Sequence, residues 1–464
     1  MKKQVSMALG VALSFGMAPR ALALGGANFS SEVISARSLG QGGVGVAGVS
    51  DDPVSAYTNP AALTAISGTR IMGEVGYVNA RPSYTDNAGN LTGSKATSVL
   101  VPGFAASSLF MDGRLAAGVS AVLPYGQETH FGGDSALKYV ATDSRLRIVV
   151  VSPSVAYKIN EQFSVGAGAD YANAVQAQLD HKVNEAALNY ILVLAGGGGA
   201  PAANFIAAGS KDASSRLAGN GDGWGYHAGL TYRPNEHHSL GLVYHSMIKI
   251  GLTGNLELTG LNGPSVSPLV FGGSSFSADF AAPVYLPQNV QFGYAFMPNE
   301  KWTLEVDAAW YDWWQSRQLG IVYSGLTPNQ AAVLASGNPL QFNPSKTINV
   351  GAGANYRWND SLQVRGGYYY QAASQAESNF NPAFMDLSRH ALTLGAGYAV
   401  NKTLSMDLAY NAVFFHSRHV TNGLGFASVV PAPYGGTPID GTFSSFAQIV
   451  SLGVTVKLPS AGGK

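Results

Sequence analysis

The sequence contains no cysteine, so neither disulfide bonds nor thiolate metal sites can stabilise the fold. Charged residues are also scarce, at 12% of the chain, about half of the ~25% that is usual in a soluble domain. There is no basic excess either, because 27 Lys and Arg residues balance 27 Asp and Glu residues. This balance gives no support to nucleic-acid binding, which depends on many cationic contacts with phosphates. The low charge instead suits a protein whose outer surface faces lipid.

No uninterrupted apolar run reaches the roughly 20 residues that a membrane-spanning helix needs. The nearest approach is the N-terminus, where Lys2 and Lys3 precede an uncharged stretch of small and apolar residues from 5 to 18. Ala21-Leu22-Ala23 then supplies the small-x-small pattern after which signal peptidase cleaves. We therefore expect residues 1–23 to be a cleaved export signal, with the mature chain beginning just after them.

What the sequence does contain is period-two alternation, repeated along almost the whole mature chain. Apolar residues alternate with polar or very small ones, which is typical of strands with one apolar face. The clearest examples lie at 302–310, 348–358 and 450–458. Alternation alone does not distinguish a soluble β-sandwich from a membrane β-barrel.

The connections between strands favour the membrane barrel. Some are long, such as roughly 181–220 and 257–285, whereas six others are compact polar turns of residues that suit turn dihedrals. Short turns on one side and long loops on the other are typical of outer-membrane barrels. Six turns join twelve strands, and one more strand is readable at each end, from Ile71 to Val78 and from Gln448 to Leu458. The six turns are Asp112-Gly113, Asn160-Glu161, Pro234-Asn235-Glu236, Pro298-Asn299-Glu300, Asn359-Asp360 and Asn401-Lys402.

These features predict an all-β protein, a 14-stranded antiparallel transmembrane β-barrel over residues 71–464. Residues 24–70 show no sustained alternation and are rich in glycine between 40 and 48. A phosphate-binding loop is a poor interpretation, because no lysine follows at Walker spacing. We expect this segment to be a plug in the lumen, since a barrel of fourteen strands is wide enough to leak unless it is filled. Within it, Asn59 can cap a short helix that starts at Pro60.

The third strand of the predicted barrel contains an anomaly, Pro124-Tyr125-Gly126. Proline donates no ladder hydrogen bond and glycine packs no side chain, so a strand that continues here should bulge or kink. In a closed barrel such a kink opens a gap in the wall. The alternative is that the strand ends at Leu123 and a loop begins.

Taken together, these motifs resemble the FadL family of outer-membrane hydrophobe transporters, in order and spacing over essentially the whole mature chain. The resemblance rests on Asn59-Pro60-Ala61 in the plug and on Tyr125-Gly126 at the kink. It also rests on Gly223-Trp224-Gly225 at a strand start, the segment from Tyr232 to Leu256, and Leu286-Pro287 before the next strand. The family resemblance agrees with the count of fourteen strands.

The resemblance implies uptake of long-chain fatty acids or similar hydrophobic molecules, without catalysis. A ligand is expected to settle between two long loops, move to a luminal pocket near Leu24 and Phe29, and leave sideways through the kinked strand. Exposed apolar patches usually mark ligand sites, although these loop residues could also pack on each other as a lid. The loop candidates are Leu188, Ile191, Leu192, Leu194, Leu269, Phe271, Phe276 and Phe280.

Fatty-acid members of the family are expected to place basic residues in the lumen to meet the ligand carboxylate. At the nearest positions this chain has Gln178 and Gly320, with Lys182 and Arg317 close by. An unpaired buried carboxylate is costly. Either Lys182 and Arg317 substitute, or the ligand is a neutral aromatic hydrocarbon such as toluene or xylene.

Two other classes of protein remain as alternatives. A general diffusion porin would have an open lumen lined by rings of charge. An outer-membrane hydrolase would need a motif such as Gly-x-Ser-x-Gly, which is absent. We expect no enzymatic activity and no cofactor. We also expect no metal, since His237-His238 beside a turn is typical of a solvated pair. We further expect a monomer in the Gram-negative outer membrane, in contact with lipid and lipopolysaccharide and inserted by the barrel-assembly machinery.

Overall fold

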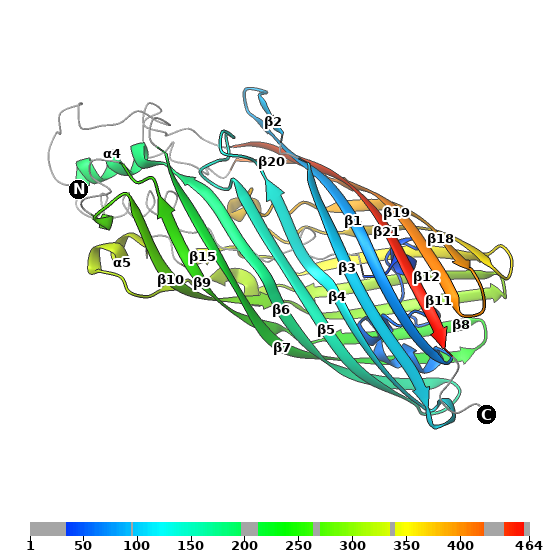
Figure 1. The fold of residues 1–464 in the computed structure, drawn as a ribbon. Helices are drawn as coiled ribbons and strands as arrows, with labels where there is room; N and C mark the ends of the chain where they lie inside the picture. The colour runs from blue at the N-terminus through cyan, green and yellow to red at the C-terminus, as the bar shows by residue number, and fades with distance from the viewer. Residues whose placement is uncertain are drawn as a thin grey trace.

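The computed structural model describes residues 34–93, 96–195, 212–262, 270–334, 339–421 and 440–458. One antiparallel sheet forms the wall of a barrel. The barrel is closed by β1 (Thr69–Asp86) and β21 (Gly441–Leu458), which are paired from Thr69↔Leu458 to Asp86↔Gly441 (Figure 1). The strand pairing is almost entirely between neighbours in the sequence, so the barrel is an up-and-down one.

The wall contains fourteen strands, as predicted, although the sheet has nineteen hydrogen-bonded segments. β8 and β9 form one strand interrupted at 246–247, β10 and β11 form one strand interrupted at Pro287, and β2, β14 and β20 are short segments of the loops. Between β1 and β21 the wall strands are β3 (Thr97–Phe110), β4 (Leu115–His130), β5 (Asp143–Lys158), β6 (Phe163–Val183), β7 (Ala213–Asn235), β8 (His238–His245), β9 (Ile248–Thr259), β10 (Ser275–Leu286), β11 (Gln288–Asn299), β12 (Trp302–Asp312), β16 (Thr347–Arg357), β17 (Leu362–Gln371), β18 (Arg389–Ala399) and β19 (Leu404–Phe415).

The six compact turns lie where the sequence predicted them, at one end of the barrel. The long connections at the other end carry the remaining short elements. Among the described residues, no helix has both the length and the hydrophobicity needed to cross a membrane. The loop elements are β2 (Leu91–Gly93), α4 (Glu185–Ala195), η5 (Trp314–Arg317), β13 (Gln318–Leu319), β14 (Val322–Tyr323), α5 (Pro328–Leu334), β15 (Leu340–Gln341), η6 (Glu377–Asn379) and β20 (Arg418–Val420), and η2 (Met111–Gly113) forms one of the compact turns.

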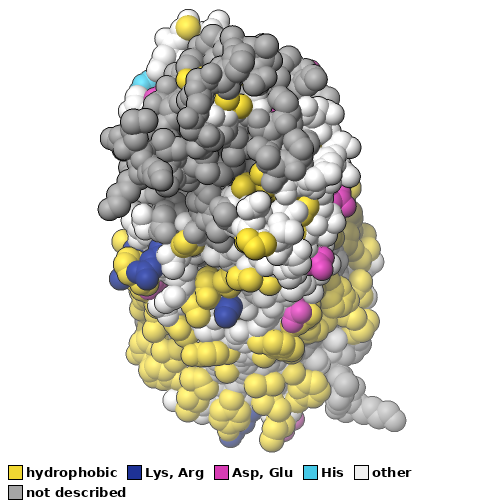
Figure 2. Space-filling model, turned by 90° about the vertical axis from the view of Figure 1, so that its left-hand side faces the viewer, with side chains coloured by type: hydrophobic (Ala, Val, Ile, Leu, Met, Phe, Trp, Pro, Cys, Tyr) yellow, Lys and Arg dark blue, Asp and Glu magenta, His cyan; other side chains and the backbone are white. Residues whose placement is uncertain are grey.

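The outer face of the wall is apolar over the half nearer the compact turns. Figure 2 shows hydrophobic side chains over the lower part of the visible face, with other side chains above them. These side chains occupy alternate positions of the strands and are exposed, which is the arrangement of a lipid-facing wall. Examples are Ile71, Val75, Tyr77, Val155, Val165, Phe292, Tyr294, Leu304, Val306, Leu392, Leu394, Leu408, Val450 and Leu452.

The inner face over the same half is polar. Its buried side chains are mainly hydroxyl, amide and charged groups, which surround a segment of chain lying inside the barrel. We call residues 34–66 the luminal segment; it contains α2 (Ala36–Leu39), α3 (Ser55–Thr58) and η1 (Pro60–Ala65). The inward polar residues include Ser107, Ser120, Ser152, Ser154, Asp170, Thr231, Ser239, Glu305, Asp307, Arg365, Thr393, Asp407, Ser451 and Thr455.

The alternation reverses in the half of the barrel nearer the long loops, where apolar side chains point inward. In β6, Asp170 is buried before a register shift between Ala174 and Ala177, and Leu179 is buried after it. A bulge adds one residue to a strand and so exchanges the two faces. The strands also run further than predicted. β6 continues to Val183 and β9 to Thr259, inside segments that we expected to be loop.

Candidate functional site

The luminal segment is fixed to the wall by backbone groups that donate to inward carboxylates. Asp307 Oδ2 accepts from the backbone N–H groups of Gly45 (2.8 Å) and Val46 (3.0 Å). Glu305 Oε1, two residues earlier on the same face of β12, accepts from the N–H of Ala47 at 2.9 Å. Three backbone N–H groups of the segment thus find acceptors on one strand, and these hydrogen bonds anchor the middle of the segment.

Asn59, predicted to cap a helix, does so and also joins the segment to the wall. Its Oδ1 accepts from the N–H of Ala61 (3.1 Å) in the first turn of η1, which begins at Pro60. Its Nδ2 donates to the carbonyl of Val46 (2.7 Å) within the segment and to that of Leu230 (3.3 Å) in β7. The side chain has no exposed surface. Asn-Pro-Ala is thus a structural joint between three stretches of backbone.

A network of charges fixes the start of the segment. Arg37 forms an ion pair with Asp51 and lies 3.5 Å from Asp407 of β19, which also pairs with Arg365 of β17 at 2.6 Å. The Arg37 guanidinium holds the pKa of Asp51 below its usual range. Burial instead raises the pKa of the neighbouring Asp52. The pKa values of these two adjacent carboxyl groups are therefore shifted in opposite directions, that of Asp51 downward and that of Asp52 upward.

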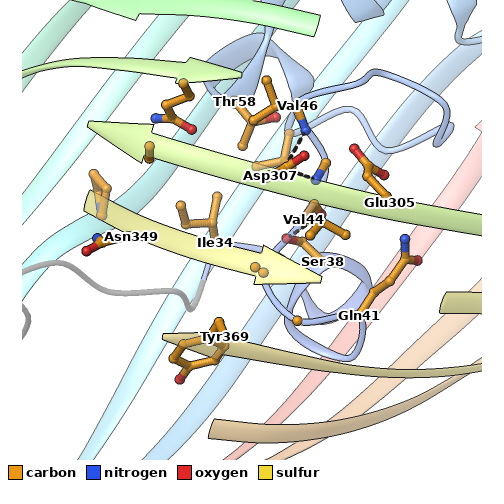
Figure 3. Close-up of a pocket in the computed structure, with 18 of the residues that line it drawn as sticks. Ile34, Ser38, Gln41, Val44, Val46, Thr58, Glu305, Asp307, Asn349 and Tyr369 are labelled. Carbon is orange, nitrogen blue, oxygen red and sulfur yellow. Dashed lines mark hydrogen bonds between the residues drawn. The ribbon is translucent and has the colours of Figure 1, made fainter. Parts of the chain in front are cut away.

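A cavity of about 140 Å³, which we call the luminal cavity, lies between the luminal segment and the wall. Figure 3 shows Ile34, Val44, Val46 and Thr58 of the segment facing Asn349 and Tyr369 of the wall across this space, beside the anchoring carboxylates. Pro124 and Tyr125 also line it. The cavity therefore reaches from the segment to the irregular strand β4.

The wall has a gap beside β4. The strand does not end at Leu123; it continues to His130, with a register shift in its pairing with β5 between Val122 and Tyr125. β3 and β4 are paired only from Phe104↔Ala121 to Phe110↔Leu115. Beyond that point each strand is hydrogen bonded only to its other neighbour, β1 or β5, within the described residues.

A second cavity, of about 170 Å³, opens at this gap, and we call it the lateral cavity. It is lined from both edges of the gap, by Val99 and Val101 of β3 and by Leu123 and Gly126 of β4. On the luminal side it is bounded by Arg389, Phe415, Ala447 and Ile449, from β18, β19 and β21. Most of these side chains are apolar, so the cavity suits a hydrophobic occupant.

Tyr125 and Tyr369 line both the luminal and the lateral cavity. Both side chains are buried. Tyr125 is in turn hydrogen bonded through its side chain to Tyr57 of α3. A tyrosine of the luminal segment is therefore in direct contact with one of the two residues that line both cavities.

The loop residues singled out from the sequence pack together where the structure describes them. Leu188, Phe271 and Phe280 are buried in one apolar cluster, and Phe276 packs against Phe271 with ring centroids 4.7 Å apart. In this state they form a closed apolar core rather than an open surface. Their role as ligand contacts stays a prediction. The side chains of Ile191, Leu192 and Leu194, and all of Leu24, Phe29 and Leu269, lie outside the described residues.

The polar residues expected to meet a carboxylate are not gathered in either cavity. Gln178 and Lys182 alternate with the buried Leu179 and His181 and so occupy the outer face of β6, where Lys182 donates to Ser214 at 3.0 Å. Arg317 lies over the exposed ring of Trp314, at 4.7 Å from its centroid. The bulge in β6 explains the misplacement, because it exchanges inward and outward positions. Arg389, which sequence reasoning missed, lines the lateral cavity instead.

Known proteins are similar to this chain over almost its whole length. The family model described as "Outer membrane protein transport protein (OMPP1/FadL/TodX)" matches residues 21–458. The long-chain fatty acid transport protein of Escherichia coli K12 is 23% identical over 414 residues, covering 86% of this chain and 90% of that protein. Outer membrane protein P1 of Haemophilus influenzae is 24% identical over 420 residues, covering 84% and 87%.

Solved structures share the fold. A Pseudomonas aeruginosa FadL homologue superposes with a TM-score of 0.76 at 21% identity, covering 93% of this chain and 99% of that one. The toluene transporter TodX of Pseudomonas putida gives a TM-score of 0.62 at 17% identity, covering 90% and 96%. The match of the family model over nearly the whole chain, together with the barrel, shows that this protein is an outer-membrane transport protein of the OMPP1/FadL/TodX family in a Gram-negative bacterium.

Proposed function

We propose that the protein takes up hydrophobic molecules through a path that leaves the barrel sideways. The ligand is captured among the long loops, passes into the luminal cavity and then past Tyr125 and Tyr369 into the lateral cavity. It enters the bilayer between β3 and β4, while the luminal segment acts as a plug that prevents leakage. The observation that carries the proposal is the loss of pairing between these two strands where the lateral cavity opens.

A sideways exit is favourable for an apolar solute. Moving from the lateral cavity into the hydrocarbon layer keeps apolar surface out of water, whereas passage down an aqueous lumen would expose it at about 25 cal/mol for each Å². The inner face around the luminal segment is polar, which supports an exit above that segment rather than through it.

The size and lining of the lateral cavity bear on the substrate class. An apolar cavity of about 150 Å³ accommodates benzene, so the lateral cavity, at about 170 Å³, holds one aromatic ring or part of an alkyl chain. Arg389 in its lining provides a cation for a carboxylate. We propose long-chain fatty acids as substrates, as in the fatty acid transport relatives, with neutral aromatic hydrocarbons as the second candidate on the strength of the cavity size.

The other function classes are less well supported. A general porin needs a continuous aqueous lumen, whereas the luminal segment here is anchored across the barrel by Glu305, Asp307 and Asn59. We propose that the protein has no enzymatic activity. We further propose that it works as a monomer in contact with lipopolysaccharide and is inserted by the barrel-assembly machinery.

The absence of native cysteine allows a direct test of the lateral path. A double variant, Val101→Cys with Leu123→Cys, places one thiol on each edge of the gap and is cross-linked with a short bismaleimide. Cross-linked protein in proteoliposomes should lose at least nine-tenths of the uptake of a labelled fatty acid. Unchanged uptake after complete cross-linking would exclude exit between β3 and β4.

The matched control is Phe104→Cys with Ala121→Cys. These two residues are register partners in the paired part of the same two strands. Cross-linking them adds the same chemical bridge without spanning the gap, and uptake should not change. Equal loss of uptake in both pairs would point to general damage to the barrel.

A further inference from the structure

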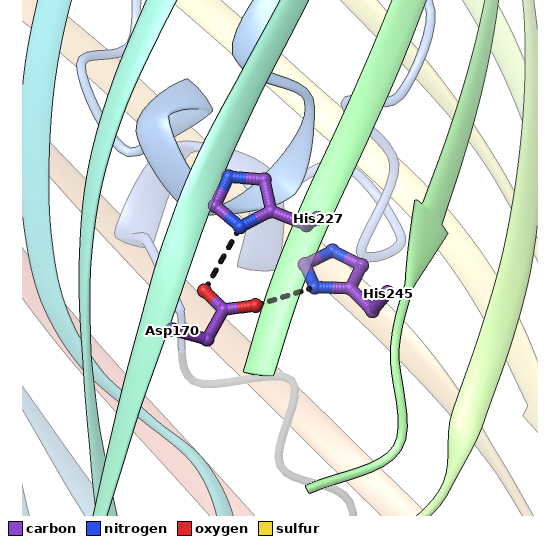
Figure 4. Close-up of side chains that lie close together, drawn as sticks. All are labelled: Asp170, His227 and His245. Atoms are coloured by element: carbon purple, nitrogen blue, oxygen red, sulfur yellow. Dashed lines mark hydrogen bonds and ion pairs between the residues drawn. The ribbon is translucent and has the colours of Figure 1, made fainter. Parts of the chain in front are cut away.

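Three inward side chains of the wall meet beneath the luminal segment, at a place that the transport path does not use. Asp170 of β6, His227 of β7 and His245 at the end of β8 all lie in the interior and are buried (Figure 4). One nitrogen or oxygen atom from each lies within 4.8 Å of the other two. His227 Nδ1 is 2.9 Å from Asp170 Oδ1, and His245 Nδ1 is 3.5 Å from Asp170 Oδ2.

The hydrogen atoms of a neutral His227 do not suffice for its contacts. Its Nδ1 faces the Asp170 carboxylate, and its Nε2 faces the carbonyl oxygen of Ala56 at 2.9 Å. Both partners accept hydrogen bonds, but a neutral imidazole carries a single N–H group. The hydroxyl of Ser154 lies 2.7 Å from the same carbonyl and 3.0 Å from Nε2, and its one hydrogen can serve only one of them. If it serves Nε2, the carbonyl of Ala56 faces a lone pair at 2.9 Å. Either the ring carries a second proton, or a cation occupies the lone pair at Nδ1.

His245 presents the same arrangement. Its Nδ1 also faces Asp170, its ring packs on Tyr57 with centroids 4.8 Å apart, and the ring is placed to donate to the backbone carbonyl of Tyr57 as well. Protonating both rings would place two positive charges beside one carboxylate in the interior. One divalent cation bound by both Nδ1 atoms and the carboxylate would leave both Nε2–H groups directed toward the luminal segment.

The surrounding wall is shaped to hold the ring of His227 in this position. Gly168 lies beside it on β6, and a Cβ atom there would stand 2.4 Å from Cε1 of His227 and 2.2 Å from the hydroxyl of Ser154. Any larger residue at 168 would displace the imidazole. The position of the ring therefore depends on a glycine in a strand interior, where glycine otherwise weakens a sheet.

We propose that Asp170, His227 and His245 bind a divalent transition-metal ion, Zn²⁺ in preference to Mg²⁺ or Ca²⁺, and that this ion fastens the luminal segment to the wall. Two imidazoles and one carboxylate, with an open fourth position, are a common ligand set for zinc, whereas magnesium and calcium prefer oxygen ligands. Bonds of 2.0–2.1 Å in a tetrahedral site place ligand atoms roughly 3.4 Å apart. The two distances from Asp170, 2.9 Å to Oδ1 and 3.5 Å to Oδ2, lie near that value, and one ligand atom from each of the three residues lies within 4.8 Å of the others, so small movements would complete the site.

The backbone carbonyl of Ala56 supplies the link to the luminal segment. Metal-bound histidines usually donate their other N–H to a carbonyl or carboxylate, and the bound ion strengthens that donor. Here the acceptor is a residue of α3, next to Tyr57. Bound metal thus holds α3 against β7, and loss of the metal loosens it.

The test uses full-length protein purified in mild detergent, freed of metal with EDTA and titrated calorimetrically with ZnCl₂. We expect one zinc ion per chain. His245→Gln and Asp170→Asn should each weaken binding at least 100-fold, with the barrel verified by heat-modifiable electrophoretic mobility. Because Asp170→Asn removes several hydrogen bonds and could impair folding, Co²⁺ added to the unaltered protein gives a second readout, the intense visible absorption of a tetrahedral site.

The control is His390→Gln, which alters the other close pair of histidine rings in the described chain, His390 and His416, 5.2 Å apart. This variant should bind zinc as the parent does. Saturating zinc should also slow proteolysis within residues 34–66 at least tenfold in the parent and not in His245→Gln. The proposal is overturned if zinc does not bind at one ion per chain, if His245→Gln retains full affinity, or if bound zinc leaves proteolysis unchanged.

Discussion

The side chain of Tyr57, in the luminal segment, is hydrogen bonded to the side chain of Tyr125, at the irregular point of β4. Both residues are buried, and Tyr125 lines the luminal and the lateral cavity alike. Movement of α3 must therefore break a contact with the strand that borders the gap. This pair links the luminal segment to the strand that borders the gap in the wall.

Removing one hydroxyl of the Tyr57–Tyr125 pair should loosen the luminal segment. Tyr57→Phe and Tyr125→Phe each leave a buried hydroxyl without its partner, which costs about 1–3 kcal/mol. The double variant should cost less than the sum of the single changes. The measurement is the urea concentration at which half of the protein has lost protection of residues 34–66 from protease. Tyr398→Phe, at an exposed position, is the control and should have no effect; strictly additive losses would show that the two hydroxyls are independent.

Arg389→Gln should separate the two candidate substrate classes. Arg389 lines the lateral cavity and donates to Gln371 at 2.7 Å. Its loss removes a cation from the path of a carboxylate, so uptake of a long-chain fatty acid should fall about tenfold or more, which corresponds to about 1.4 kcal/mol. Uptake of toluene should stay unchanged. The same assay on Arg317→Gln, whose guanidinium lies over an exposed tryptophan, should show no change for either ligand. Equal losses for both ligands in Arg389→Gln would contradict a role in charge recognition.

Gly229→Ala should dislodge the Asn-Pro-Ala joint. A Cβ atom at 229 would lie 2.2 Å from Oδ1 of Asn59, so either the side chain or the segment must move. Overpacking of this kind costs typically about 1–3 kcal/mol. Residues 34–66 should become sensitive to protease while the barrel keeps its folded mobility on electrophoresis. Gly73→Ala, in open space on β1, should leave the digestion pattern as it was; a protected segment in Gly229→Ala would mean that the joint tolerates the methyl group.

Asp51→Asn and Asp52→Asn should differ in their dependence on pH. The pKa of Asp51 is lowered by Arg37, so its contribution is present above its usual pKa of 3.8 and is lost as pH falls below that value. The pKa of Asp52 is raised by burial, so its contribution is present at acid pH and lost as pH rises through the raised value. At pH 7, Asp51→Asn should loosen the luminal segment and Asp52→Asn should not. Asp51 is 43% exposed, which limits its effect to about 1 kcal/mol.

The difference is measured as the temperature at which half of the protein has released the luminal segment, for each variant at pH 7 and at pH 3. The gap between Asp51→Asn and the parent should be smaller at pH 3 than at pH 7, because residue 51 of the released segment is then mostly protonated while Arg37 keeps the native carboxylate charged. A gap of the same size at both values would show that the Arg37–Asp51 ion pair does not hold the segment.

The fold was predictable from the sequence because the barrel is built from local patterns. Turn residues at six places and period-two alternation between them determine the number of strands and their pairing with neighbours. The bulges were not predictable, since one extra residue leaves the alternation intact and only changes its phase. Gln178 and Lys182, which the family resemblance suggested for the lumen, follow the bulge of β6 and occupy its outer face.

The site was harder to predict because its residues lie far apart in the sequence. Glu305 and Asp307 look like ordinary polar positions of a strand, and only the fold places the backbone of residues 45–47 above them. The three residues of the proposed metal site likewise show no motif spacing, since His227 and His245 meet Asp170 only across three adjacent strands. Asn59-Pro60 was predictable because its cap is formed within the chain's own next two residues.

The pairing of β1 with β21 also bears on how the protein is made. These strands are the first and last of the sheet, so the ring has a seam that remains open until its final strand is in place. The segment that ends up inside immediately precedes one side of that seam. If the luminal segment enters before β1 pairs with β21, its helices need not be threaded through a closed barrel. We therefore expect the segment to be placed inside before these two strands pair.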